Sequence, residues 1–335
     1  MTTAAPLEVR SLMKRFPLGG AVRRAHVHAV DDVSFELHPG TITALVGESG
    51  SGKSTVARLL AHLSEPSGGE VLFEGSDVTH VRRRRDVLHY RSQVQIIFQD
   101  PFGSLNPVKT VRHHVERPLR IHRIVPARQV EQRVHELLRT VGLVPPEDIA
   151  AKYPHELSGG QRQRVAIARA LAVEPKVVLA DEPISMLDVS IRIGILNLMS
   201  KLKEEHGIAF LYVTHDLASA RYVADDILVM YAGQIVERGP IEDVLSAPLH
   251  PYTRLLLDAV PDPATKTEGQ QIELRKGDSS AAVDPGEGCR FRARGPLAIE
   301  ICSHTTPQLV EERPEHAARC HVTAPAPEVV AVISR

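Results

Sequence analysis

The segment Gly47-Glu-Ser-Gly-Ser-Gly-Lys-Ser54 restricts what this chain can fold into more than any other part of the sequence. It matches the pattern G-x-x-x-x-G-K-[ST], between an apolar run at residues 41–46 and a helical pattern at residues 54–63. A buried strand, this turn and a helix, in this order, predict a phosphate-binding loop. The same context argues against the alternative, a glycine-rich turn that only precedes a helix.

Each residue type in this loop has a chemical reason. Glycines let backbone N–H groups approach phosphate oxygens without obstruction by a Cβ atom, and the helix N-terminus adds the positive end of its dipole. The pattern assigns the Lys53 ammonium to the β- and γ-phosphates and the Ser54 hydroxyl to Mg²⁺. The predicted nucleotide-binding residues here are Gly47, Ser49, Gly50, Ser51, Gly52, Lys53, Ser54 and Thr55.

A second apolar run, residues 177–180, ends in the adjacent acids Asp181 and Glu182. At the end of a buried strand, Asp181 suits a Mg²⁺ ligand, directly or through water. Glu182 is placed to polarise an attacking water molecule. An exposed turn is the alternative, but the phosphate-binding loop upstream favours the catalytic interpretation.

A second turn precedes a predicted helix at residues 161–172. It consists of the small residues Ser158, Gly159 and Gly160, followed by Gln161. Such residues expose N–H groups at a helix start, where an anion can bind. Taken alone, the turn would be only a helix cap. A second anion site in a chain with one phosphate-binding loop is explained if it serves the γ-phosphate of a nucleotide held by another subunit.

The run Ser158-Gly-Gly-Gln-Arg-Gln-Arg164 resembles the signature sequence of the ABC family of ATPases. The resemblance implies further site residues, which follow in the expected order. Gln99 is similar to the Q-loop glutamine that contacts Mg²⁺ and couples to membrane subunits, and His215 to the switch histidine at the γ-phosphate. The segment ending in Asp188 is similar to the D-loop, with Met186 in place of the usual alanine. Phe16 resembles the aromatic residue that stacks on adenine, although a strand-end Phe can also be a core residue.

Three further segments resemble the oligopeptide and dipeptide importer subfamily: residues 99–107, 230–237 and 250–256. The resemblance implies ATP and Mg²⁺ as ligands and a head-to-tail dimer with a second ABC subunit, identical or paralogous. Each ATP would lie between Lys53 of one chain and Ser158 of the other. The catalytic set would be Glu182, His215, Lys53 and Gln99. Two membrane permease subunits and an extracytoplasmic binding protein would complete an importer, with this chain at the cytoplasmic face of the membrane.

Other functions were weighed against peptide import. The same machinery in related importers moves sugars or nickel. A soluble ABC ATPase of translation or DNA repair usually has two cassettes or a long coiled-coil insertion, and this chain has neither. A non-hydrolysing regulatory subunit is disfavoured because both Glu182 and His215 are intact.

The predicted fold is α/β: a P-loop core with an antiparallel β subdomain and a helical subdomain at about residues 108–172. Alternation of strands and helices predicts a mostly parallel sheet. Residues 1–260 would form the nucleotide-binding domain and residues 261–335 a linker followed by a carboxy-terminal extension. Residues 262–288, rich in Pro, Gly, Ser, Asp and Lys, have no apolar period and predict a linker or loop.

Net charge and hydropathy narrow the classes of partner. The formal net charge is −1, so no overall basic field favours nucleic acid. No apolar stretch approaches the ~18 residues that a membrane helix needs. The amino terminus lacks the basic and apolar regions of a signal peptide. A membrane role therefore requires partner subunits.

Three cysteines, Cys289, Cys302 and Cys320, all lie in the carboxy-terminal extension. In the importer subfamily this region often reads C-x-F-x-x-R-C-P, and some members hold a [4Fe–4S] cluster there. Gly295 stands at the second cysteine position of this chain, and four thiolates are the norm for a cluster. Three possibilities stay open: an iron–sulfur cluster, a zinc site, or unligated thiols. The candidate fourth ligands are His304, His316 and His321.

Overall fold

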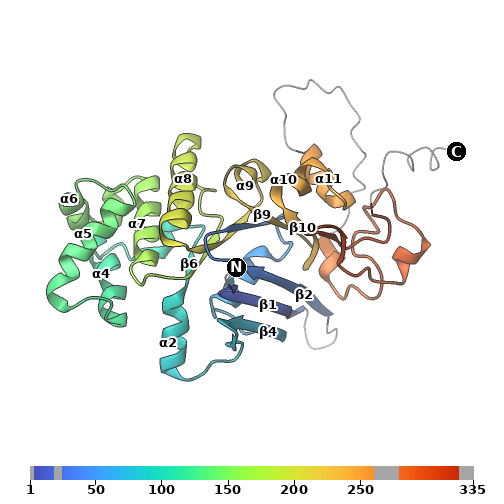
Figure 1. The fold of residues 1–335 in the computed structure, drawn as a ribbon, viewed down its shortest axis with the longest axis horizontal. Helices are drawn as coiled ribbons and strands as arrows, with labels where there is room; N and C mark the ends of the chain where they lie inside the picture. Colours follow the sequence, from blue (N-terminus) through green and yellow to red (C-terminus); the bar gives the residue numbers. More distant parts are fainter. Residues whose placement is uncertain (1–3, 19–24, 260–278, 324–335) are drawn as a thin grey trace.

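The computed structural model describes residues 4–18, 25–259 and 279–323. One eight-stranded sheet forms the centre of the molecule, and its strand order is β11-β12-β10-β9-β3-β8-β7-β6. Figure 1 shows this sheet between a group of helices on the left and the carboxy-terminal extension on the right. Its strands are β3 (Ile42–Val46), β6 (Val94–Ile97), β7 (Val177–Asp181), β8 (Ala209–Thr214), β9 (Asp226–Tyr231), β10 (Gln234–Pro240), β11 (Val310–Arg313) and β12 (His316–Ala318).

The middle of the large sheet is parallel and fully buried. β3 pairs in parallel with both β8 and β9, and β7 pairs in parallel with β6 and β8. Every residue of β3, β7 and β8 is buried, which explains their continuous apolar sequence. The carboxyl ends of β3, β7 and β8 therefore meet at one edge of the sheet. The phosphate-binding loop, the acidic pair and His215 follow these three strands.

A second sheet is antiparallel, with the order β2-β1-β4-β5. Its buried side chains share a core with α1 and with one face of the large sheet, and Figure 1 shows its strands below the large sheet. This is the predicted antiparallel subdomain. Its strands are β1 (Leu7–Leu18), β2 (Ala25–Leu37), β4 (Gly68–Phe73) and β5 (Ser76–Asp77).

The helical subdomain lies at one end of the molecule, on the left in Figure 1. Its buried residues, including Val115, Val134 and Leu138, belong to the core that lines the other face of the large sheet. The apolar periodicity of this segment therefore reflects packing of its helices on one another and on the sheet. The helices are α3 (Pro101–Ser104), α4 (Val111–His122), η1 (Ala127–Gln129), α5 (Val130–Thr140), α6 (Pro146–Ala151), η2 (Pro154–Glu156) and α7 (Gly159–Leu171).

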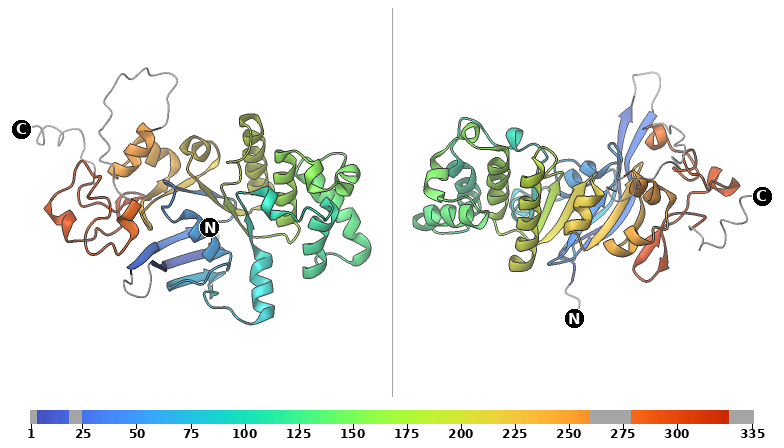
Figure 2. Two further views of the ribbon diagram at one scale, coloured as in Figure 1. Left: turned by 180° about the vertical axis from the view of Figure 1, so that it is seen from behind. Right: turned by 90° about the horizontal axis from the view of Figure 1, so that it is seen from above.

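Six more helices connect the strands or border the carboxy-terminal side of the sheet. In the views of Figure 2, α8 and α9 lie on the sheet face opposite the antiparallel subdomain. None of the helices in the described part of the chain is both long and apolar enough to cross a bilayer. The bounds are α1 (Lys53–Leu60), α2 (Arg84–Gln93), α8 (Val189–His206), α9 (Leu217–Val223), α10 (Ile241–Ser246) and α11 (Pro251–Asp258).

The carboxy-terminal extension joins the main sheet. β12 pairs with β10, and β11 pairs with β12. Two short 3₁₀ helices, η3 (Ser279–Ala282) and η4 (Glu300–Ser303), complete it. The sequence pattern did not predict these strands, because three- and four-residue strands carry too little periodicity to be recognised.

The expected linker at residues 262–288 is only partly testable. Its first part, residues 262–278, lies outside the described residues. Residues 279–288 comprise the short 3₁₀ helix η3 and a loop, and they pack on β2. Val283 forms an antiparallel bridge with Val27, and Asp284 exchanges hydrogen bonds of 2.9 and 3.0 Å with His26. Ala282 is buried in the core. Pairing with a distant segment of the same chain, rather than local periodicity, orders these residues.

A buried carboxylate, Glu237 of β10, joins α11 to β12. It is fully buried, and it accepts hydrogen bonds from the N–H groups of Leu249 (2.6 Å) and His250 (2.9 Å). The His316 Nε2 atom lies 2.7 Å from the Glu237 Oε1 atom. His250 caps α11, since its Nδ1 atom accepts a 3.0 Å bond from the Tyr252 N–H. Burial lowers the pKa of His250 to about 4, although the nearby Glu237 opposes the shift.

This lowered pKa predicts a pH-dependent contribution to stability. The unfolded chain protonates His250 below about pH 6.5, whereas the native state resists protonation until about pH 4. The unfolded state therefore binds more protons between these values, and the free energy of unfolding falls as pH falls. The replacement His250→Asn keeps a capping acceptor and removes the titration. We expect the wild type to lose about 3 kcal/mol relative to this variant between pH 6.5 and 4.

Urea unfolding of both proteins across this pH range measures the difference. The comparison at pH 8, where both side chains are neutral, sets the baseline. Parallel curves of unfolding free energy against pH would contradict a buried neutral His250.

Candidate functional site

The phosphate-binding loop turns from β3 into α1 through glycines with positive φ. The φ values are 150° at Gly47, 81° at Gly50 and 110° at Gly52. A Cβ atom on Gly47 would lie 2.1 Å from the Met230 carbonyl oxygen, and one on Gly52 would lie 2.0 Å from the Ala29 carbonyl oxygen. Glycine is therefore required twice, because the loop lies directly on the backbones of β2 and β9. No side chain caps α1 at Gly52, so its first N–H groups face outward for an anion.

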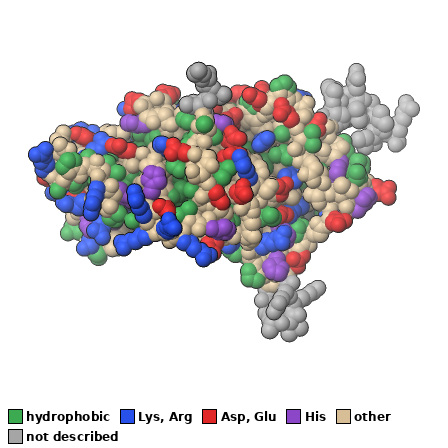
Figure 3. All heavy atoms as spheres, turned by 60° about the horizontal axis from the view of Figure 1, so that its bottom comes forward, with side chains coloured by type: hydrophobic (Ala, Val, Ile, Leu, Met, Phe, Trp, Pro, Cys, Tyr) green, Lys and Arg blue, Asp and Glu red, His purple; other side chains and the backbone are tan. Residues whose placement is uncertain are grey.

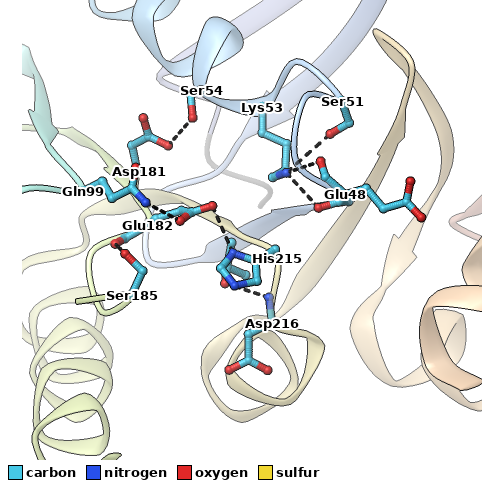
Figure 4. A network of polar contacts seen from close by, with 12 residues as sticks. Glu48, Ser51, Lys53, Ser54, Gln99, Asp181, Glu182, Ser185, His215 and Asp216 are labelled. Carbon is cyan, nitrogen blue, oxygen red and sulfur yellow. Dashed lines mark hydrogen bonds and ion pairs between the residues drawn. The ribbon is translucent and has the colours of Figure 1, made fainter. Parts of the chain in front are cut away.

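Lys53 carries a buried positive charge inside this loop. Its side chain is 5% exposed and its Nζ atom donates to the carbonyl oxygens of Gly47 and Glu48, both at 2.8 Å, and to Ser51 Oγ at 3.4 Å. Figure 4 shows it reaching back over the loop from the start of α1. Burial lowers the pKa of Lys53. Among the described residues it has no ion-pair partner, so an anion in the loop would compensate a charge that the protein leaves unpaired.

Ser54 of α1 and Asp181, the last residue of β7, are in direct contact. The Ser54 hydroxyl donates to the Asp181 Oδ1 atom at 2.8 Å. Burial raises the pKa of Asp181, although the hydrogen bond from Ser54 and the charges of Arg58 and Lys53 oppose the shift. A hydroxyl and a carboxylate are hard oxygen ligands, of the kind that Mg²⁺ takes together with phosphate oxygens. The donor set therefore fits Mg²⁺.

Glu182 is held between two of the three other predicted catalytic side chains, Gln99 and His215. The Gln99 Nε2 atom donates to Glu182 Oε2 at 2.8 Å, and the His215 Nδ1 atom lies 3.1 Å from Glu182 Oε1. The Ser185 hydroxyl donates to the Glu182 carbonyl oxygen at 3.1 Å. The backbone of Glu182 has a φ of 46°, an unusual value for a residue with a side chain. Figure 4 shows Gln99, Glu182, Ser185 and His215 grouped together, apart from Lys53.

The predicted second anion site lies outside this cluster, at the start of α7 in the helical subdomain. Ser158 Oγ accepts from the Gln161 N–H at 3.3 Å, and Gln161 Oε1 accepts from the Ser158 N–H at 3.0 Å. This reciprocal pair is a capping box. A Cβ atom on Gly160 would lie 2.5 Å from the Ile191 side chain of α8. The small residues therefore have a packing role within one chain, and the exposed Ser158 stays available to a second subunit.

Asp188 and Phe16 also lie outside the central cluster. Asp188 is the exposed residue before α8, and its side chain makes no capping hydrogen bond. Phe16 belongs to β1 and is 41% exposed, so it is not a core residue. The Lys14 ammonium lies 5.1 Å from the centre of its ring.

Sequence reasoning missed two residues that contact the phosphate-binding loop from the carboxy-terminal side. Tyr252 Oη accepts a 2.9 Å hydrogen bond from the Glu48 N–H. Arg294 donates to both oxygens of the Glu48 carboxylate, at 2.7 and 2.8 Å. Both residues lie in segments that resemble the importer subfamily, Tyr252 within residues 250–256 and Arg294 at the arginine of the C-x-F-x-x-R-C-P pattern, but their contact with the loop could not be seen without the fold.

The three cysteines line one small cavity together with Gly295. Its volume is about 20 Å³, which is close to the space for one water molecule. Burial raises the pKa of Cys289 and raises that of Cys320 to about 11, so the thiol form is favoured over the thiolate that metals bind.

The candidate histidine ligands are engaged elsewhere or exposed. His316 contacts Glu237, the His321 Nε2 atom lies 2.8 Å from the Thr305 carbonyl oxygen, and His304 is exposed. No group of three or more His, Cys, Asp or Glu side chains within residues 4–18, 25–259 and 279–323 is arranged to hold a metal ion. The residues present do not fit an iron–sulfur cluster or zinc, and these two expectations receive no support.

The chain is similar to known proteins over nearly its whole length. A family model described as "ABC transporter" matches residues 30–185, and one described as "Oligopeptide/dipeptide transporter, C-terminal region" matches residues 236–302. The oligopeptide transport ATP-binding protein AppF of Bacillus subtilis is 42% identical over 322 residues, covering 94% of this chain and 97% of that protein. OppF of the same organism is 44% identical, covering 89% of this chain and 96% of that protein.

Solved structures show the same fold. A dimeric ATP-binding cassette in a post-hydrolysis state, bound to ADP and Pi, aligns with a TM-score of 0.62 and 30% identity. The alignment covers 70% of this chain and 98% of that one. The cassette fold therefore accounts for most of the chain, and the second family model extends into the carboxy-terminal extension.

The geometry of the loop predicts that replacing different glycines will cost different amounts of unfolding free energy. Gly52→Ala would place a Cβ atom 2.0 Å from the Ala29 carbonyl oxygen, so the backbone must move. We expect a loss of about 3 kcal/mol of unfolding free energy. Gly50→Ala is the matched control, because nothing lies within 4 Å of its Cβ position. There only the positive φ is unfavourable, and the expected cost is about 1 kcal/mol.

Urea unfolding without nucleotide separates the two variants. Equal losses at the two positions would show that backbone conformation alone, and not the contact with β2, selects glycine at position 52.

Proposed function

The chain belongs to the ATP-binding subunits of ABC transporters, in the oligopeptide and dipeptide class, and from this premise we propose that it hydrolyses ATP to power peptide import. One observation carries the proposal: Lys53 is a buried cation that has no ion-pair partner among the described residues. A polyphosphate in the loop offsets that charge. Two printed names, AppF and OppF, describe oligopeptide transport in the relatives, and the peptide substrate is extended to this chain from them.

We propose a role for each residue of the central cluster, supported by the contacts described above and by the resemblance to ABC ATPases. Lys53 and the loop amides hold the β- and γ-phosphates, and Ser54 and Asp181 hold Mg²⁺ with Gln99 nearby. Glu182 accepts the proton of the attacking water, while His215 orients Glu182 and contacts the γ-phosphate. Mg²⁺, when bound, neutralises charge that develops on the phosphate oxygens. Fixed charges of this kind supply most of the catalysis in phosphoryl transfer.

A second subunit completes the site in this proposal. Ser158 is exposed at the start of α7, where the helix dipole favours an anion. In a head-to-tail dimer it would contact the nucleotide held by Lys53 of its partner, together with Gly159, Gly160 and Gln161. Asp188 would lie at the same interface. The partly exposed Phe16 would stack on adenine.

We propose that membrane permease subunits bind the helical subdomain. A groove of about 450 Å³ lies there, bordered by Gln95 of β6 and by basic residues. Figure 3 shows Lys and Arg side chains gathered over this end of the molecule. The groove is close in sequence to Gln99, so movement of a bound permease would reach the cluster around Glu182. The proposed assembly has two permease subunits and an extracytoplasmic binding protein, with this chain at the cytoplasmic membrane face. Groove residues include Lys109, His113, Arg117 and Arg169.

The proposed domain division follows the predicted one. Residues 1–260 form the nucleotide-binding domain, and residues 261–335 form the carboxy-terminal extension. The extension has no iron–sulfur cluster in this proposal, since Cys289, Cys302 and Cys320 enclose too little space.

The assignment of the base predicts the behaviour of Glu182→Gln. The variant keeps the shape of the side chain but cannot accept a proton, so we expect the ATPase kcat to fall by about 10²–10⁴-fold. ATP binding is unaffected, and the ATP-bound dimer should accumulate. Phosphate release and size-exclusion chromatography with Mg-ATP measure the two effects. Glu204→Gln, at an exposed site on α8, is the control.

Turnover within ten-fold of the wild type in Glu182→Gln would overturn the assignment of the base. Lys53→Ala should show neither activity nor ATP-driven dimer formation, which separates failure to bind ATP from failure to hydrolyse it.

A further inference from the structure

Glu48, the second residue of the phosphate-binding loop, is held by the carboxy-terminal extension. Arg294 donates two nearly parallel hydrogen bonds to its carboxylate, at 2.7 and 2.8 Å. This bidentate geometry is the strongest form of an Arg–carboxylate pair. Figure 4 shows the Glu48 side chain pointing away from Asp181 and Glu182. Its carboxylate therefore takes no part in the central cluster.

The backbone of Glu48 is held as well. Its N–H donates to Tyr252 Oη at 2.9 Å, and its carbonyl oxygen accepts from Lys53 Nζ at 2.8 Å. Three polar groups of one residue thus contact the extension, α11 and the phosphate-binding lysine. Glu48 connects the carboxy-terminal side of the molecule to the group that receives phosphate.

Buried aromatic side chains pack behind Arg294 and Tyr252. Phe291, 3% exposed, packs against the rings of Tyr231, His250 and Tyr252, with centroid distances of 5.2, 5.4 and 5.7 Å. The Arg294 guanidinium also lies 5.7 Å from the centre of the Tyr231 ring. These buried aromatic contacts restrict the rotamers of both groups.

The loop that carries Arg294 is itself tightly turned. The N–H groups of Arg294 and Gly295 both donate to the Phe291 carbonyl oxygen, at 3.0 and 2.7 Å. A Cβ atom on Gly295 would lie 3.2 Å from that oxygen. Glu237 anchors the start of α11 to β12 on the other side. The Arg294 guanidinium, which donates to the Glu48 carboxylate, and the Tyr252 hydroxyl, which accepts from the Glu48 N–H, are therefore preorganised.

We propose that the carboxy-terminal extension and α11 together position the phosphate-binding loop, with Arg294 of the extension and Tyr252 of α11 as positioning residues that act through Glu48. The inference rests on the proposed function as an ATPase. Lys53 must leave the carbonyl oxygens of Gly47 and Glu48 to reach a phosphate. Fixing Glu48 keeps the loop open and its N–H groups convergent while the lysine moves. Without the pair, ordering the loop becomes part of the cost of binding ATP.

The experiment measures binding of a fluorescent methylanthraniloyl-ATP with Mg²⁺ to the full chain. We expect Arg294→Ala and Glu48→Gln each to weaken binding by five- to ten-fold. The double variant should be no weaker than either single one, because both remove the same interaction. Arg292→Ala is the matched control: this exposed neighbour bonds to the Cys289 carbonyl oxygen within its own loop.

Rescue separates positioning from a general structural role. The exchange of charges in Glu48→Arg with Arg294→Glu should recover at least half of the lost affinity, and Arg294→Lys should be intermediate. Steady-state ATPase assays should show a raised KM with kcat within about two-fold of the wild type, because Glu182 is untouched.

Three results are decisive against the inference. Affinity within two-fold of the wild type in Arg294→Ala would reduce the pair to a surface contact. Additive losses in the double variant, or no rescue by charge exchange, would mean that Arg294 only stabilises the fold, which thermal melting would register. Wild-type binding that Lys53→Ala leaves unchanged would instead refute the proposed function, and the positioning role would fall with it.

Discussion

The buried charge of Lys53 is the constraint on which the rest of the site depends. An ammonium group that is 5% exposed and has no ion-pair partner among the described residues is costly unless carbonyl oxygens surround it. The loop provides those oxygens only because Gly47 and Gly52 let its backbone lie against β9 and β2. β9 lies beside the loop because β3 pairs with both β8 and β9 in the middle of the large sheet, whereas β2 belongs to the antiparallel sheet. The arrangement of the large sheet therefore helps to determine how the charge of Lys53 is stabilised.

Much of this could be predicted from the sequence, because the information is local. The loop, the acidic pair and His215 each follow a short apolar run, and parallel strands bring their carboxyl ends together. The contacts of Glu48 with Arg294 could not be predicted, since the two residues are 246 positions apart. Nothing in a glutamate at the second position of the loop indicates its partner. The three-residue strand β12 and the packing of residues 279–288 were missed for the same physical reason: each is ordered by distant segments rather than by its own period.

The start of α7 shows how one sequence can satisfy two interpretations. Ser158 and Gln161 form a capping box that a single chain needs, and Gly160 lets α7 approach Ile191. The same groups form the site proposed for the partner's nucleotide. Local structure therefore cannot decide between cap and ligand site. The relatives supply the functional interpretation, and the single chain supplies the reason why the residues are small.

The pairing of β12 with β10 has a consequence for the exposed edge of the large sheet. Without the extension, β10 would present a row of unpaired backbone N–H and C=O groups, a template on which another chain can add a strand and aggregate. The extension covers that row and moves the rim of the sheet out to β11, whose sequence is Val-Glu-Glu-Arg and whose residues are all exposed. A strand so short and so charged is a poor template for intermolecular pairing. Within the described residues, the extension thus gives the sheet a border that disfavours the addition of a strand from another molecule.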